Sequence, residues 1–229
     1  QRTPVLFQAG MSERGRTFAA QHAECIFVVG SSRSGATLAQ DLHERALLQG
    51  RSNKDIKLIG GVAPIVGGTE SEAFNKQAEY EESLSVEAGL AHISGNLGVD
   101  LGDIDPDQPL ESFQTERVQG FIKNLLDSAP SDTRTMGDLI KSNLAGAWLT
   151  GSVEQVADEL ERRFRSGLDG FNLTYTVTPG TFVDFVDGVV PILQKKGLVQ
   201  REYAPGTLRK KLFGQDRLPS NHPAAAVRF

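Results

Sequence analysis

The sequence predicts an α/β protein whose strand–helix units form a parallel sheet covered by helices. Short apolar runs alternate with segments of helical periodicity along the chain, which is the pattern of parallel sheets. The 229 residues, 39% of them hydrophobic and 23% charged, are enough to bury a core. Eight-unit (β/α) barrels of the TIM type take about 250 residues. Four units with a long insertion therefore fit half of such a barrel, and a small open sheet is the alternative.

The first three units each place an apolar strand before a helix. The predicted pairs are strand 5–8 with helix 12–23, strand 25–29 with helix 36–48, and strand 56–66 with helix 70–88. Gly10, Gly30 and Gly67 follow the three strands and mark the turns. The first two strands read as buried because their runs are apolar, whereas Gly60 and Gly61 weaken the signal of the third.

The stretch 90–150 breaks this rhythm. It contains an acidic, proline-bearing segment at 99–109 and helical patterns at 115–128 and 135–143. Nearly sixty residues between two strands are too long for an ordinary connection. We therefore expect an inserted helical subdomain or lid.

The fourth unit has the clearest boundaries. Ser152 and Gln155 have the spacing of a capping box, and the helix that follows closes at Gly167. Apolar and polar residues alternate over 171–177, which predicts a strand, and a last helix over 182–193 contains Pro191, which should kink it. The tail 198–229 is expected to be extended, with a loose end.

Composition and charge exclude several classes of protein. The formal charge of −5 and short basic clusters such as 209–211 disfavour a nucleic-acid binder. A single cysteine, Cys25, excludes an intrachain disulfide and a cysteine zinc site. This low cysteine content makes a reducing cytoplasm the expected compartment. No apolar run or signal peptide indicates a membrane segment. Because the chain starts at Gln1 without a methionine, we expect a fragment or a processed product.

The best candidate for a site is the turn at Gly10, Met11 and Ser12. It joins a buried strand directly to a helix N-terminus, where free amides and the helix dipole attract an anion such as phosphate. Ser12 offers a hydroxyl to the ligand or to the helix. The alternative is purely structural: Ser12 caps the helix and Gly10 turns the chain. The spacing is neither GxGxxG nor a P-loop.

The other candidates are weaker. The loop 30–35 could bind an anion but reads more simply as a connection, and Cys25 reads as a core residue. The four histidines have no metal-ligand spacing, so no metal site is predicted. No Ser–His–Asp or paired-carboxylate arrangement is visible, and the catalytic residues stay unknown.

Several stretches together resemble the bacterial-luciferase-like flavin monooxygenases. The branch is that of the nitrilotriacetate, dibenzothiophene-sulfone and long-chain alkane monooxygenases. The resembling stretches cover most of 2–213 and include PVLFQAG (4–10), FAAQHAE (18–24), GSVEQVAD (151–158), DGFNL (169–173), DFVD (184–187) and TLR (207–209). Each is weak alone, but their order and spacing are specific.

The resemblance implies the C-terminal half of an eight-stranded barrel, with strands five to eight. Residues 1–90 would hold units five to seven, 91–150 the inserted segment, 151–213 the last unit and its extension, and 214–229 a loose tail. It also implies that Gly10, Met11 and Ser12 hold the phosphate of FMN, although Met11 replaces a small polar residue common there.

The implied function is that of a two-component monooxygenase. Reduced FMN, supplied by a separate NAD(P)H-dependent flavin reductase, reacts with oxygen to oxidise a small organic substrate. Because the first four strands are absent, activity belongs to the parent enzyme, and an exposed sheet edge favours a homo-oligomer. The rivals are a non-catalytic module for a phosphorylated ligand and another phosphate-binding barrel enzyme. For an aldolase, Lys57 is a poor candidate because it starts a strand.

Overall fold

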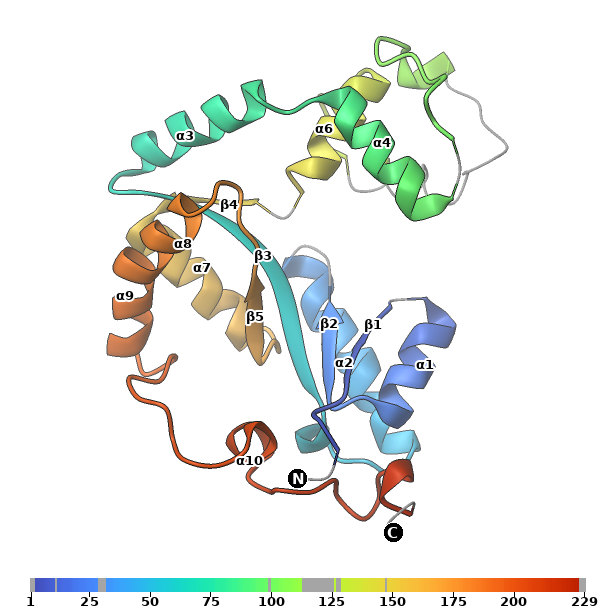
Figure 1. Ribbon diagram of the computed structural model, residues 1–229, viewed down its shortest axis with the longest axis vertical. Helices are drawn as coiled ribbons and strands as arrows, with labels where there is room; N and C mark the ends of the chain where they lie inside the picture. The colour runs from blue at the N-terminus through green and yellow to red at the C-terminus, as the bar shows by residue number, and fades with distance from the viewer. Residues whose placement is uncertain are drawn as a thin grey trace. The chain divides into compact units, whose positions relative to one another are not determined.

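The computed structural model describes residues 3–10, 12–28, 32–98, 100–112, 126, 129–146 and 148–226 (Figure 1). It confirms the α/β class, with parallel strand pairing. Contacts within the chain divide it into two compact units. The first comprises residues 1–73 and 149–229, and the second comprises residues 74–148.

The first unit contains the sheet. Its strands in the described residues are β1 (Phe7–Ala9), β2 (Cys25–Val28), β3 (Lys57–Gly67), β4 (Trp148–Ser152), which begins at the boundary of the units, and β5 (Gly170–Leu173). The order is β1-β2-β3, with β4 and β5 both paired to β3. Parallel register places Cys25 opposite Lys57 and Ile59 opposite Gly170. The long strand β3 is therefore the centre of the sheet.

Helices cover one face of this sheet. The helices of the first unit are α1 (Glu13–His22), α2 (Ser32–Leu48), α7 (Val153–Arg165), α8 (Gly180–Asp184), α9 (Val190–Lys195) and α10 (Leu208–Phe213). Leu58 of β3 packs in one core cluster with α1 and α2, whereas Val62 and Val66 pack with α7 and α9. These three residues share a face because side chains alternate along a strand. Figure 1 shows α1 and α2 beside β1 and β2, and α7 and α9 beside β3 and β5.

Two predictions about strands need correction. β4 was missed, because Gly151 and the capping residue Ser152 weaken the strand signal in a run of only five residues. The predicted strand 171–177 stops at Leu173, followed by one more ladder bond from the Thr174 N–H to the Val62 carbonyl at 2.9 Å. Beyond it, the hydroxyl of Thr181 accepts the N–H groups of residues 176 and 177, which replaces strand pairing with a turn.

Two helices predicted in the first unit differ from the prediction in their start or form. α2 begins at Ser32, four residues earlier than expected. The last predicted helix is three consecutive pieces, in which a π-helical turn over Phe185–Val189 joins α8 to α9. The Val190 N–H bonds to the Phe185 carbonyl, so the distortion expected from Pro191 takes the form of a widened turn just before it.

The second unit is helical. It contains most of α3 (Glu70–Glu82), together with α4 (Val86–Leu97), the short 3-10 turn Leu110–Ser112 and α6 (Met136–Leu144). The single helix expected over 70–88 is therefore two helices, because Ser85 caps α4 through a bond from the Ala88 N–H at 3.1 Å. The core joins Leu90 and Ile93 of α4 to Leu139 and Ile140 of α6. The helix expected at 115–128 lies outside the described residues, apart from residue 126.

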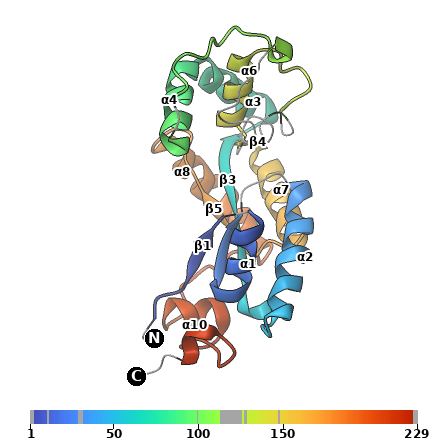
Figure 2. The same cartoon turned by 90° about the vertical axis from the view of Figure 1, so that its right-hand side faces the viewer.

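The C-terminal segment departs from the extended, loose tail that the sequence predicted. It contains α10 and the 3-10 turn Pro223–Ala226, and Leu218, His222 and Ala225 are buried. Figure 2 shows α10 near the start of the chain, below β1. Two polar side chains hold this segment: Arg209 bonds to Glu24, and His222 bonds to the carbonyl of His22. A hydrophobicity pattern does not reveal such contacts. Within the described residues, no helix has both the length and the apolar character that a membrane crossing requires.

Candidate functional site

The predicted turn lies at the carboxyl end of β1, where the chain enters α1. Gly10 follows the strand with φ +140°, a backbone conformation that favours glycine. Ser12 is the N-cap of α1, and its hydroxyl oxygen accepts the N–H of Gly15 at 3.1 Å. Met11 lies outside the described residues. The structural role of Ser12 is thus established, and its hydroxyl proton is still able to donate to a ligand.

Backbone approaches backbone closely in this turn. A Cβ placed on Gly15 would lie 2.6 Å from the carbonyl oxygen of Gly10, and a Cβ on Gly10 would lie 3.0 Å from Nε2 of Gln8. The turn therefore folds back onto the first turn of α1 only because residue 15 has no side chain. Helix geometry leaves the first amides of α1 without intrahelical acceptors, and Ser12 accepts from one of them. The result is a cradle lined by backbone.

Gln8 places an unsatisfied acceptor beside this cradle. Its Nε2 donates to the carbonyl of Ala9 at 2.9 Å, whereas Oε1 is buried and has no hydrogen-bond partner within the described residues. A buried acceptor without a donor is unfavourable by about 1–3 kcal/mol. Sequence reasoning did not single out Gln8, although its position at the end of β1 was visible.

The charges next to the turn balance one another. Glu13, in the first turn of α1, pairs with Arg45 at 2.7 Å and with Arg16 at 2.8 Å, and Asp41 of α2 pairs with the same two arginines at 2.7 and 3.1 Å. The hydrogen bond from Arg45 is the main cause that lowers the pKa of Glu13. The acidic residue nearest the helix N-terminus is therefore held by cations, which reduces its repulsion of an anion.

A second feature lies at the same edge of the sheet, after β5. The rings of Tyr175 and Phe182 are 6.1 Å apart and both are exposed. Beside them, Thr181 fixes the loop through two backbone amides, and the hydroxyl oxygen of Thr176 is buried without a partner in the described part of the chain. In parallel barrels this edge carries the active site. The sequence did not predict this loop, because the alternation over 171–177 assigned its first residues to a strand.

The weaker candidates find structural roles. Ser32 through Gly35 belong to the start of α2 rather than to a loop, and residues 30 and 31 lie outside the described residues. Cys25 is fully buried, and burial raises the pKa of its thiol to about 11, so it is a core residue as expected. Lys57 starts β3 and its ammonium lies 2.8 Å from Asp169. In the described residues, no group of three or more potential ligands could hold a metal ion.

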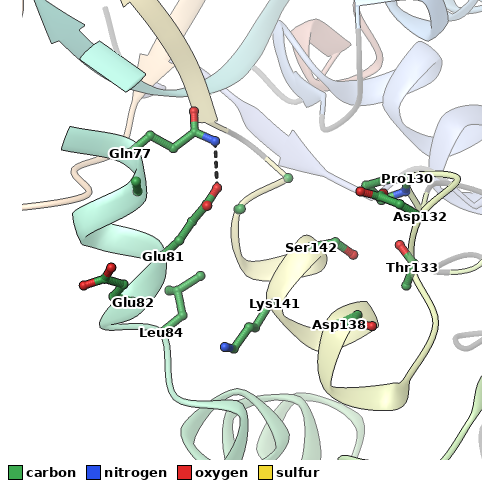
Figure 3. Close-up of a pocket in the computed structure, with 13 residues that line it drawn as sticks. Gln77, Glu81, Glu82, Leu84, Pro130, Asp132, Thr133, Asp138, Lys141 and Ser142 are labelled. Carbon is green, nitrogen blue, oxygen red and sulfur yellow. Dashed lines mark hydrogen bonds between the residues drawn. The ribbon is translucent and has the colours of Figure 1, made fainter. Parts of the chain in front are cut away.

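The second unit has an open cleft of about 800 Å3 between α3 and α6 (Figure 3). Its charged lining side chains are Glu81, Glu82, Asp132, Asp138 and Lys141. Asp138 accepts the N–H groups of Arg134 and Thr135, and these bonds lower its pKa. The carboxylate of Asp138 is thereby committed to capping α6, and we assign no chemistry to this cleft.

The parallel sheet, the helices on one face and the glycine turn at the strand end together define an α/β protein of the barrel type. Residues 1–170 match the family of luciferase-like monooxygenases, so the chain belongs to that family. This confirms the resemblance inferred from the sequence.

Two relatives match the whole chain. The dimethyl-sulfide monooxygenase of Hyphomicrobium sulfonivorans is 40% identical, and the long-chain alkane monooxygenase of Geobacillus thermodenitrificans is 41% identical. The match covers 100% of this chain and 49% of each relative. The chain thus spans about half the length of these relatives. Dibenzothiophene-sulfone and nitrilotriacetate monooxygenases also match, each at 32% identity, which confirms the branch.

Solved structures give the same result. DmoA from Hyphomicrobium sulfonivorans superposes with a TM-score of 0.87 at 40% identity, covering 100% of this chain and 50% of that one. A riboflavin lyase, solved with a modified FMN and riboflavin, superposes with a TM-score of 0.82 at 34% identity over 100% of this chain and 52% of that one. The fold expected from the sequence is confirmed.

Proposed function

We propose that this chain forms one half of an FMN-dependent, two-component monooxygenase that oxidises a small organic substrate with O2. The main support is the backbone cradle at Gly10 and Ser12, which lies at the carboxyl end of β1 and the N-terminus of α1. In a barrel of parallel strands, that edge carries the ligand. Relatives with monooxygenase names match over the full length of the chain.

The residues present fit the phosphate end of FMN. Amides of the first turn of α1 would donate to the phosphate, with Ser12 and the backbone of Gly10 and Met11 beside it. Gly15 keeps the cradle open, since a side chain there would collide with the Gly10 carbonyl. The orphaned Oε1 of Gln8 is an acceptor and therefore suits a hydroxyl donor such as those of the ribityl chain.

Reduced FMN, when bound, would supply the electrons for the reaction with oxygen. The part of this chain is to bind the phosphate, orient the flavin and exclude water. The loop after β5, with Tyr175 and Phe182, offers apolar surface at the same edge of the sheet for the last of these tasks. We assign no catalytic residue.

Three further elements complete the proposal. A separate NAD(P)H-dependent reductase would deliver the reduced flavin. The inserted segment 91–150 follows β3 and α3 in the chain and would form a lid over the substrate. Deleting that segment in a full-length relative would then abolish turnover, and unchanged turnover would remove this role.

We also propose that the chain self-associates, which sedimentation would detect.

The test of the flavin site is an anaerobic titration of reduced FMN, with the chain alone and mixed with a separately expressed N-terminal half of a relative. The informative variant is Ser12→Asp, because aspartate is an equally good N-cap but adds a negative charge at the cradle. We expect affinity to fall at least about tenfold from charge repulsion. Ser85→Asp, at the cap of α4, is the matched control and should leave binding unchanged.

Three outcomes would count against the proposal. Equal affinities of the wild type and Ser12→Asp for reduced FMN would mean that the phosphate does not bind at this turn. No binding to either the chain or the mixture would reduce the monooxygenase assignment to ancestry. Binding of inorganic phosphate without binding of FMN would favour a module for another phosphorylated ligand.

A further inference from the structure

The C-terminal strap, residues 207–226, is fastened to the sheet unit at two separate points. One point is Arg209 in α10, and the other is His222, just before the turn Pro223–Ala226. Both side chains are buried, at 0% and 2% exposure. Burial of such polar groups is costly unless each is hydrogen-bonded, so their partners define what the strap does.

At the first point, Arg209 forms a bidentate ion pair with Glu24. Its Nε lies 2.7 Å from Oε1 of Glu24, and its second terminal nitrogen lies 2.9 Å from Oε2. The guanidinium also donates to the carbonyls of Thr3 and Pro4 at 2.9 and 2.7 Å. Glu24 in turn accepts the N–H of Leu6 at 3.0 Å. Arg209 therefore holds the chain that leads into β1.

At the second point, His222 closes the end of α1. Its Nε2 lies 2.9 Å from the carbonyl oxygen of His22, and its Nδ1 accepts the N–H of Ala224 at 3.1 Å. A backbone amide can only donate, so Nδ1 carries no proton and Nε2 is the donor. Arg51, itself 2% exposed, donates to the carbonyls of Ala20 and Ala23. Arg51 and His222 together satisfy the carbonyls of Ala20 and His22 in the last turn of α1 and that of its C-cap Ala23.

The charged groups around His222 decide how it responds to acid. Burial is the largest cause that lowers the pKa of His222 from its ordinary 6.5, and Arg51 and His22 lower it further. The His22 carbonyl and Glu24 act in the opposite direction. From the strap itself, Asn221 bonds to the Gly50 carbonyl at 3.0 Å and lies 3.3 Å from Oδ2 of Asp55. A proton on Nδ1 would break the hydrogen bond from the Ala224 N–H, because two donors would then face each other. It would also add a positive charge beside Arg51.

We propose that the strap is a two-point latch in which Arg209 stays docked and His222 releases the end of the chain in mild acid. Release would open residues 214–226 and remove one cap from the C-terminus of α1, while α10 keeps its bonds to Glu24. The stabilisation by His222 is complete above pH 6.5, because the unfolded state then binds no extra proton. It is lost as the pH falls from 6.5 through the lowered pKa of the docked histidine.

Limited digestion with proteinase K, followed by mass spectrometry of the intact chain, tests the latch at pH 5.5 and pH 7.5. In the wild type, we expect cleavage within 214–221 to be at least about tenfold faster at pH 5.5, relative to a peptide substrate at the same pH, with α10 left attached. His222→Gln keeps an N–H donor for the His22 carbonyl but cannot titrate, so it should cleave at one rate at both pH values. The control His43→Gln, in α2, should keep the wild-type dependence.

A second variant separates the two anchors. Arg209→Lys loses the paired geometry with Glu24 and should loosen the strap at both pH values. The latch is wrong if wild-type cleavage within 214–221 is the same at the two pH values. It is also wrong if His222→Gln retains the full pH dependence, or if cleavage in acid is spread over the whole chain.

Discussion

Lys57 and Asp169 lie 112 residues apart and fasten the amino-terminal ends of β3 and β5 together. The Lys57 ammonium is 2.8 Å from Oδ1 of Asp169, while Oδ2 accepts the backbone N–H of Leu58 at 2.9 Å. The Asp169 N–H also donates to the Leu58 carbonyl at 2.8 Å. One aspartate thus sets the register of the central strand pair through both its backbone and its side chain.

The two bonds of the Asp169 carboxylate should differ in their energies. The ion pair is partly exposed, so it contributes about 0–1 kcal/mol, whereas leaving the Leu58 N–H without an acceptor costs about 1–3 kcal/mol. We therefore expect Asp169→Ala to lower the free energy of unfolding by more than Lys57→Met does, with Asp169→Asn between them. Urea unfolding measures all three. Equal losses for Asp169→Ala and Lys57→Met would mean that the ion pair carries the effect.

Two helical glycines offer a matched pair for testing the candidate turn. A Cβ at Gly95 in α4 would meet nothing within 4 Å, so Gly95→Ala should raise stability by about 0.5–1 kcal/mol through helix propensity. The same change at Gly15 gains this propensity but places Cβ 2.6 Å from the Gly10 carbonyl. We expect Gly15→Ala to destabilise by about 1–3 kcal/mol.

The turn must also move in Gly15→Ala, so the affinity for reduced FMN should fall, whereas Gly95→Ala should leave it unchanged. Unfolding in urea and the anaerobic titration together check this pair. If both substitutions stabilise the chain to the same extent, Gly15 is not the residue that lets the turn fold onto α1.

The sequence predicted features whose partners are close in the chain. Ser152 and Gln155 form the expected capping box, with the Ser152 N–H donating to the glutamine side chain at 2.8 Å. Gly10 and Ser12 lie at the end of β1, as their position before a helical pattern indicated. In each case, donor and acceptor or strand and helix are only a few residues apart, so spacing alone carries the information.

The contacts that hold the sheet unit together were not predictable in this way. Arg209 read as part of a short basic cluster, yet it is fully buried against Glu24, 185 residues away. The alternation over 171–177 is typical of a strand, but the hydroxyl of Thr181 competes for the amides beyond Leu173. The orphaned acceptor of Gln8 depends on the path of the turn around it. Such contacts depend on tertiary packing, which a single sequence does not encode in its spacing.

Cys25 provides a chemical probe of the sheet. The thiol is fully buried between β1 and β3, and burial raises its pKa to about 11, with Glu24 and Asp169 adding to the shift. Only the thiolate reacts, and at pH 8 its fraction would be about 100-fold lower than for a thiol with the ordinary pKa of 9.0. Burial slows access further.

We therefore expect the native chain to react with a disulfide reagent at pH 8 at least about 100-fold more slowly than the chain unfolded in urea. The matched control combines Cys25→Ala with Leu48→Cys, which places the cysteine at a position that is 84% exposed at the end of α2. That variant should react almost as fast folded as unfolded. Rapid labelling of native Cys25 would show that β2 opens readily between its neighbours, and it would remove the assignment of Cys25 to the core.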